Sequence, residues 1–303
     1  MSRLTSPLAA AVLFLVGGAC AEDGAEPVAE PSSTVEITEQ PSRSPAPSPS
    51  PSPSPTPDPP PAATTQHASA ESLAGDLLAA EAAIRDPQTP EAHLRRWAHV
   101  QQAAYRQLAL TPEWHDTVTA LVPTALRSAY EANLRATVEL FALTEPRDAL
   151  PPWEIVTPPP PDELRSHYVA AADEFGVDWT YLAAIHLVET RMGRIRGDSV
   201  AGARGPMQFL PSTWEAYGEG DITDPRDAIR AAARYLVAHG APADMPGALW
   251  AYNHSDRYVA AIESYAAVMQ TEPVAYEAYY HWQVYYRLRS GDTILEEGWD
   301  NTA

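Results

Sequence analysis

Glu189 is the residue whose type and position best suit proton-transfer chemistry. It comes near the end of a predicted helix that follows Gly176 and that Asp178 caps at its N-terminus. Three apolar residues share its face at helical spacing: Leu182, Ile185 and Met192. Partial burial on that face raises the pKa of a carboxyl group and makes it a proton donor near neutral pH. A helix-end glutamate paired with Arg191 or Arg194 explains the same position, and spacing alone leaves both interpretations open.

Three further motifs follow Glu189-Thr190 along the chain. They are G-P-M-Q-F at 205–209, D-P-R-D-A-I at 224–229 and A-Y-N at 251–253. In this order the motifs resemble those of the soluble lytic transglycosylase family, whose catalytic domain is related to goose-type lysozyme. The resemblance covers residues 162–270, and it favours the acid interpretation of Glu189 over the salt-bridge one.

The resemblance implies a role for each polar residue of these motifs. Glu189 would be the general acid and then the base of the reaction. Gln208 would hydrogen-bond the sugar in the cleft, and Tyr252 would hold the Glu189 carboxyl group. Asn253 would also line the cleft.

The same resemblance assigns the remaining site residues to the walls of the cleft. Met207 and Phe209 would shape its floor. Thr190 stands where the family usually has serine, and because the hydroxyl is kept we expect its role as a substrate-binding residue to be kept. Pro206 stands where many members of the family have leucine.

The implied reaction cleaves the β-1,4 bond between N-acetylmuramic acid and N-acetylglucosamine in peptidoglycan and leaves a 1,6-anhydromuramoyl end. Most glycosidases use two carboxylates, whereas this family manages with one. Asp198, Asp221 and Asp224 are the candidates for a second carboxylate if the enzyme is instead a muramidase, although Asp224 fits better as the cap of a helix. A wall-binding protein that does not cut is the third alternative, and the intact Glu189 argues against it.

Neither a metal nor a cofactor is expected. His186 and Glu189 form an H-x-x-E pair, but neither an H-E-x-x-H motif nor a cysteine cluster accompanies it. Four aromatic residues flank the motifs and fit either sugar stacking or core packing, with core packing favoured by their spacing: Trp179, Tyr181, Trp214 and Tyr217.

The N-terminus predicts export and attachment to a membrane. An apolar stretch too short to span a bilayer precedes small residues and Cys20, the single cysteine, as in a lipoprotein signal peptide over residues 1–20. A lipid on Cys20 would anchor the protein to a membrane facing the cell wall; cleavage after Ala21 and secretion is the alternative. The formal charge of −20 argues against a nucleic-acid partner, and the sequence does not reveal which protein partner directs the enzyme.

Composition and periodicity divide the rest of the chain. Residues 21–68 are rich in proline and serine and predict a disordered linker. Residues 69–150 predict a helical accessory region with three helices, the third running from Leu121 to Phe141. Residues 151–303 predict the lysozyme-like domain and a C-terminal tail with a hairpin around Ser290-Gly291-Asp292. The fold class expected for the whole is mostly α.

Overall fold

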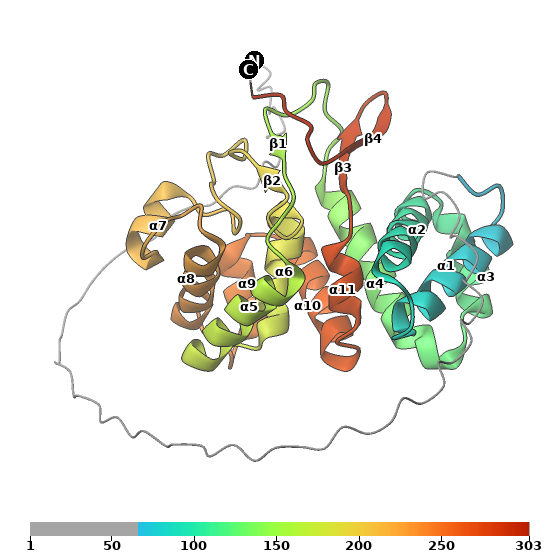
Figure 1. The fold of residues 1–303 in the computed structure, drawn as a ribbon, viewed down its shortest axis with the longest axis horizontal. Helices are drawn as coiled ribbons and strands as arrows, with labels where there is room; N and C mark the ends of the chain where they lie inside the picture. Colours follow the sequence, from blue (N-terminus) through green and yellow to red (C-terminus); the bar gives the residue numbers. More distant parts are fainter. Residues whose placement is uncertain (1–65, 303) are drawn as a thin grey trace, which may run out of the picture. The chain divides into compact units, whose positions relative to one another are not determined.

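The computed structural model describes residues 66–302, which lie within one compact unit (Figure 1). This part of the chain is mostly helical, as the sequence predicts. The predicted signal peptide, Cys20 and nearly all of the predicted linker lie outside the described residues. None of the helices between residues 66 and 302 combines the length and the apolar character that crossing a membrane requires.

The first two helices agree with the sequence prediction, and the third agrees over all but its first residues. Helix α1 spans Ala70–Arg85 and α2 spans Glu91–Leu110. The predicted third helix is confirmed from Leu126 to Phe141 as α4, Thr124–Leu143, whereas Leu121 ends a separate helix, α3, His115–Leu121. Pro123 stands at the N-cap of α4 with φ −57° and ψ 145°, where its ring and missing amide end one helix and begin the next. A short 3-10 turn, η1 at Pro112–Trp114, precedes α3.

The helices after the proline-rich connector, residues 146–161, carry the predicted motifs. In chain order they are α5 (Pro161–Phe175), α6 (Trp179–Thr190), α7 (Pro211–Tyr217), α8 (Pro225–Ala238), α9 (Met245–Tyr252), α10 (Asp256–Thr271) and α11 (Ala275–Tyr280). Asp178 caps α6 by accepting a hydrogen bond from the Thr180 amide at 2.9 Å, as predicted. Most side chains of α6 are buried, so it forms the centre of this part of the fold.

Two short antiparallel ladders complete the fold. The proline-rich connector contains β1, Glu154–Ile155, which pairs with β2, Ile195–Arg196, shortly after α6. The predicted C-terminal hairpin is confirmed as β3, Val284–Leu288, and β4, Gly291–Leu295. A two-residue strand such as β1 carries no alternating pattern, which explains why the sequence did not reveal it.

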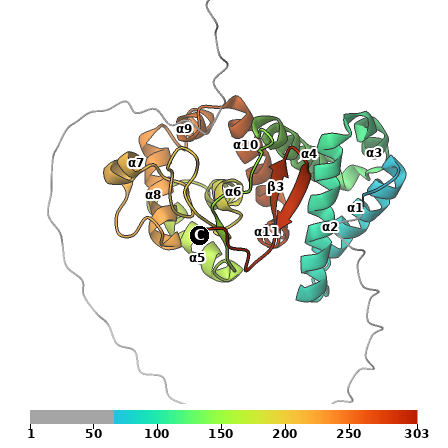
Figure 2. The ribbon, with the colours of Figure 1, turned by 90° about the horizontal axis from the view of Figure 1, so that it is seen from above.

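Helix α10 connects the accessory helices to the helix that bears Glu189. It packs against both α4 and α6, and Figure 2 shows α10 between these two helices. One hydrophobic core contains Ala98 and Ala136 from the accessory helices together with Leu182 and Ile262 from the motif-bearing part. The two sides of the predicted boundary near residue 150 therefore share a core. Their division into an accessory region and a catalytic domain stays a prediction.

Candidate active site

Glu189 lies in the last turn of α6, with its side chain partly buried. The Tyr258 hydroxyl donates a hydrogen bond to its Oε1 at 2.8 Å. Burial raises the pKa of the Glu189 carboxyl group to about 7, against the opposing effect of the Tyr258 hydrogen bond. The group therefore holds its proton over a wide range of pH and can still release it near neutrality, as a general acid must.

Neither nearby arginine pairs with Glu189. Arg191 donates to the Leu187 carbonyl at 2.6 Å, and Arg194 forms an ion pair with Glu297. Within residues 66–302 Glu189 forms no ion pair at all. The salt-bridge interpretation of its position is therefore wrong.

Two tyrosines stand beside the carboxyl group. Tyr258, in the first turn of α10, supplies a hydrogen bond to Glu189 that the sequence did not reveal, and the role expected for Tyr252 stays a prediction. Tyr252, at the end of α9, donates to the Met207 carbonyl at 2.7 Å, and its ring lies parallel to that of Tyr258 with centroids 6.4 Å apart. Burial and then the charge of Glu189 raise the pKa of both phenols, so both remain protonated donors. Sequence reasoning missed Tyr258, which belongs to no motif that it singled out.

The backbone turns sharply after Glu189. Arg191, Met192 and Gly193 have φ values of 53°, 60° and 85°, a left-handed run in which the two non-glycine residues are strained. The Thr190 hydroxyl donates to the Pro206 carbonyl at 2.6 Å and accepts from the Gly193 amide at 3.1 Å. Thr190 has no exposed surface. Its predicted substrate contact is therefore corrected to a positioning role, in which it ties the turn to the 205–209 motif.

The 205–209 motif forms a tight loop against this turn. Gly205 has φ 72°, and a Cβ there would lie 1.9 Å from the Ile222 carbonyl oxygen, so only glycine fits. Gln208 also has a positive φ, 52°, and its side-chain amide donates to the Gly205 carbonyl at 2.9 Å. Met207 is fully buried and Phe209 nearly so, which makes them support for the loop rather than an open floor.

A small pocket connects this loop with the A-Y-N motif. Gln208 and Phe209 line it together with Tyr252 and Tyr235. Asn253 directly follows α9 and is 7% exposed. The structure thus brings Gln208 and Tyr252 to one pocket and places Glu189 beside the same tyrosine; substrate contact by Gln208, Tyr252 and Asn253 stays a prediction.

The three candidate second carboxylates have other partners. Asp198 pairs with Arg204 at 3.2 Å, and Asp221 accepts hydrogen bonds from Thr223. Asp224 caps α8, as expected. Among the described residues, the causes of the Glu189 pKa shift include no second carboxylate.

The remaining sequence candidates are part of the core. His186 is fully buried, its Nδ1 lies 2.6 Å from the Tyr168 hydroxyl, and burial lowers its pKa to about 3. Residues 66–302 contain no cluster of histidine, cysteine or acidic side chains that could hold a metal ion. Four aromatic residues pack, partly buried, against the main core: Trp179, Tyr181, Trp214 and Tyr217.

Comparison with known proteins agrees with this geometry. The family model described as "Transglycosylase SLT domain" matches residues 167–272. The chain is also similar to the membrane-bound lytic murein transglycosylase F of Thiobacillus denitrificans, with 36% identity over 75 residues, or 25% of this chain and 16% of that protein. The chain thus spans about a sixth of that relative's length. No solved structure matches.

Proposed function

Because residues 167–272 are a domain of the lytic transglycosylase family, we propose that this chain cleaves peptidoglycan between N-acetylmuramic acid and N-acetylglucosamine without consuming water. The observation that carries the proposal is the state of Glu189. Its pKa is raised to about 7, and no second carboxylate among residues 66–302 contributes to the shift. A single carboxyl group with this pKa suits a reaction in which one group must first give and then take a proton.

In the first step protonated Glu189 donates its proton to the glycosidic oxygen. The bond from C1 of the muramic acid to that oxygen breaks, and the N-acetylglucosamine hydroxyl leaves. The carbonyl oxygen of the muramic acid N-acetyl group attacks C1 from the other face, which replaces the enzyme nucleophile that most glycosidases supply. The Tyr258 hydroxyl, held 2.8 Å from Oε1, orients the carboxyl group for the transfer.

In the second step the Glu189 carboxylate takes the proton from the C6 hydroxyl of the same muramic acid. The C6 oxygen then attacks C1, the bond from the acetyl oxygen to C1 breaks, and a 1,6-anhydro ring closes. The hydrogen bond from Tyr258 stabilises the carboxylate between the two steps. Glu189 ends protonated, as it began, so the cycle requires no further acid or base.

Digestion of purified peptidoglycan in water enriched in oxygen-18 tests the proposed product. We expect mass spectrometry to show anhydromuramoyl ends without the heavy isotope. Reducing ends that carry oxygen-18 would show a muramidase and overturn the transglycosylase proposal. Binding of intact strands without any cleavage would favour the wall-binding alternative.

We also propose that a lipid on Cys20 holds the protein in the cell envelope. The name of the Thiobacillus relative calls that protein membrane-bound, and Cys20 follows the small residues expected before a lipidated cysteine. In cells labelled with a fatty acid, the wild-type protein should carry the label in the membrane fraction and Cys20→Ser should not. Unlabelled wild-type protein would contradict the anchor and favour cleavage after Ala21.

A further inference from the structure

The last turn of α9 carries an exposed tryptophan. Trp250 is 45% exposed, and within residues 66–302 no other tryptophan, tyrosine or phenylalanine belongs to the exposed class. The core side of α9 is formed by Met245, Ala248, Leu249 and Tyr252, so helical spacing places Trp250 on the opposite side. A single exposed apolar residue is ordinary by itself, and its surroundings decide whether it has a role.

The imidazole of His254 packs against the indole of Trp250. The two ring centroids are 4.3 Å apart and the rings are inclined by 69°, an edge-to-face arrangement that aromatic pairs favour. His254 is itself exposed, and within residues 66–302 neither its ring nitrogens nor the indole N–H of Trp250 form a hydrogen bond. The pair therefore presents an open aromatic surface with unused hydrogen-bonding groups at its edges.

Hydrogen bonds fix the corner between α9 and α10 that carries this pair. The Tyr235 hydroxyl donates to the Ala251 carbonyl at 2.8 Å, which ties the end of α9 to α8. The Ser255 side chain caps α10 by accepting a hydrogen bond from the Tyr258 amide at 3.5 Å. Helix α9 also packs against both α8 and α10, and Figure 2 shows it beside α10. Rings on such a support lose little freedom when they bind a ligand.

The same corner reaches the site around Glu189. Tyr252, two residues after Trp250, has its ring parallel to that of Tyr258, whose hydroxyl donates to Glu189 at 2.8 Å. An α-helix with its side chains is about 10–12 Å across, so Trp250 lies on the far side of α9 from Tyr252 but close to it. The ring pair is thus outside the immediate surroundings of Glu189 and continuous with them through residues 252–258.

A sugar ring matches this surface better than a protein partner does. The axial hydrogens of N-acetylglucosamine form apolar faces that can cover an indole, and its hydroxyls can bond the unused groups at the ring edges. The centre of a protein interface is a larger apolar patch that is poor in charge. Here the exposed Asp256 and Arg257 follow His254 closely, and Arg257 pairs with Glu139.

We propose that Trp250 and His254 form a stacking platform for an N-acetylglucosamine ring of the same glycan strand that is cleaved at Glu189. This inference rests on the proposed function, because its ligand is the strand that the Glu189 site would cleave. A strand that occupies both places must pass over the α9–α10 corner, so only strands longer than the part held at Glu189 reach the platform. Trp250 then determines which strand lengths are bound tightly and takes no part in the proton transfers.

Calorimetric titration of the full chain with peptide-free glycan strands tests the proposal. Glu189→Gln protein excludes cleavage from the readout and makes the result independent of the reaction product. Adding Trp250→Ala should weaken the binding of long strands about tenfold, as expected for the loss of an aromatic anchor, and should leave the binding of a tetrasaccharide unchanged. Leu110→Ala is the matched control, because Leu110 is 54% exposed at the end of α2 and belongs to no motif.

Two further measurements separate stacking from a change in folding. Trp250→Tyr keeps an aromatic face and should bind long strands within about threefold of the parent protein. The indole N–H resonance of Trp250, assigned by its loss in Trp250→Tyr, should shift when long strands are added to the Glu189→Gln protein.

Three outcomes would overturn the proposal: equal binding of long strands by Trp250→Ala, an equal loss with Leu110→Ala, or an indole resonance that stays in place. The first would leave a protein partner as the occupant of this surface. If wild-type protein released reducing ends or did not cleave at all, while Trp250→Ala still weakened the binding of long strands, the proposed reaction would fall and the platform would stand.

Discussion

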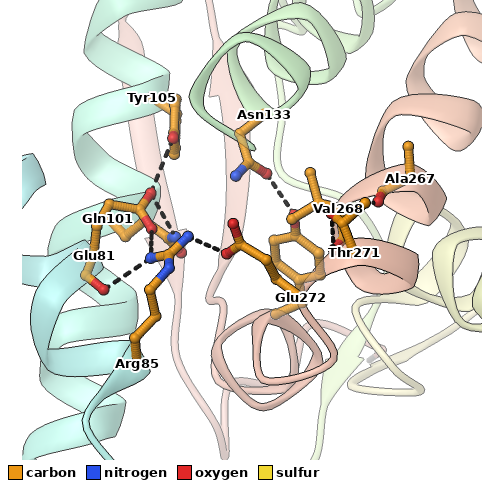
Figure 3. A network of polar contacts seen from close by, with 10 residues as sticks. Glu81, Arg85, Gln101, Tyr105, Asn133, Ala267, Val268, Thr271 and Glu272 are labelled. Atoms are coloured by element: carbon orange, nitrogen blue, oxygen red, sulfur yellow. Dashed lines mark hydrogen bonds and ion pairs between the residues drawn. The ribbon is translucent and has the colours of Figure 1, made fainter. Parts of the chain in front are cut away.

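Two glutamates in buried surroundings, Glu81 in the accessory helices and Glu189 in α6, are held in opposite ways. Glu81 accepts hydrogen bonds from Arg85, Gln101 and Tyr105 at 2.5, 3.0 and 3.0 Å (Figure 3). Glu189 has one hydrogen-bond donor, Tyr258, and no ion pair within residues 66–302. Glu81 thus has its oxygens occupied by three donors, whereas at Glu189 burial outweighs the single hydrogen bond and raises the pKa of the carboxyl group.

The difference indicates a structural role for Glu81 and a chemical role for Glu189. The network around Glu81 also reaches α10 and α11, through the ion pair of Arg85 with Glu272 and the hydrogen bond from Tyr279 to Asn133 at 2.5 Å. It therefore fixes the accessory helices to the part of the fold that carries Tyr258. The Glu81 carboxylate already accepts three hydrogen bonds within the protein, so it is not available to bind a substrate. Glu189 accepts one and can form further hydrogen bonds to a substrate.

Glu189→Gln tests this comparison with the largest expected effect. We expect wall cleavage to fall by ~10³-fold, because the amide cannot donate or accept the proton. Muropeptide release from purified peptidoglycan measures the loss, and thermal melting serves as the control, with the melting temperature unchanged or raised. Activity within tenfold of wild type would remove Glu189 from the mechanism.

Glu81→Ala should instead affect stability. Removing the Glu81 carboxylate leaves the buried donors of Gln101 and Tyr105 without their acceptor and Arg85 paired with Glu272 alone, at a cost of about 1–3 kcal/mol in the free energy of unfolding. Glu139→Ala is the matched control, because Glu139 belongs to the half-exposed pair with Arg257 and its loss should cost less than about 1 kcal/mol. Equal costs in urea denaturation would mean that the Glu81 network is not special.

Tyr258→Phe sharpens the comparison by removing the last donor from Glu189. The hydrogen bond lowers the Glu189 pKa, so its loss should raise that pKa and move the alkaline fall of kcat/KM to higher pH. We also expect kcat to fall about tenfold, since the carboxyl group loses its orientation. Tyr276→Phe, which removes a tyrosine hydroxyl bonded to the Pro161 carbonyl at 2.8 Å, should leave the pH profile in place. An unshifted profile in Tyr258→Phe would contradict the role of this contact.

The smallest effect is expected at Thr190, which acts through the backbone. Thr190→Val removes the hydroxyl that joins Pro206 and Gly193 and should cost about 1–3 kcal/mol of stability, with a loss of activity of about fivefold. Thr190→Ser keeps the hydroxyl and should restore both. A valine variant with full activity but reduced stability would limit Thr190 to a structural role.

Whether the surroundings of each glutamate could be predicted from the sequence depends on how far apart along the chain its hydrogen-bond partners lie. Glu189 could be found because burial on one helix face follows from local spacing, and the downstream motifs decided between two interpretations of it. Its partner Tyr258 is 69 residues away, and no local pattern connects them. The Glu81 network was also missed. A glutamate in a helix is expected to be exposed unless hydrogen-bond donors from other helices are known to surround it.

Two local errors have local causes. The break at Pro123 was passed over because apolar residues stand close on both sides of it, at Leu121 and Leu126, and were read as one helix. Thr190 was assigned to substrate because its hydroxyl matched a motif, and a motif does not reveal which way a side chain points. Its hydroxyl is consumed by Pro206 and Gly193 in the protein itself.

The most direct test of the central claim is the titration of the Glu189 carboxyl carbon by NMR in the full chain, with Glu189→Gln used to assign its resonance. The contrast with Glu81 requires that burial outweighs the single hydrogen bond from Tyr258, which predicts a midpoint at about pH 7. A midpoint near 4.3, the ordinary value for glutamate, would mean that Glu189 is ionised at neutral pH. It could not then be the acid that begins the reaction.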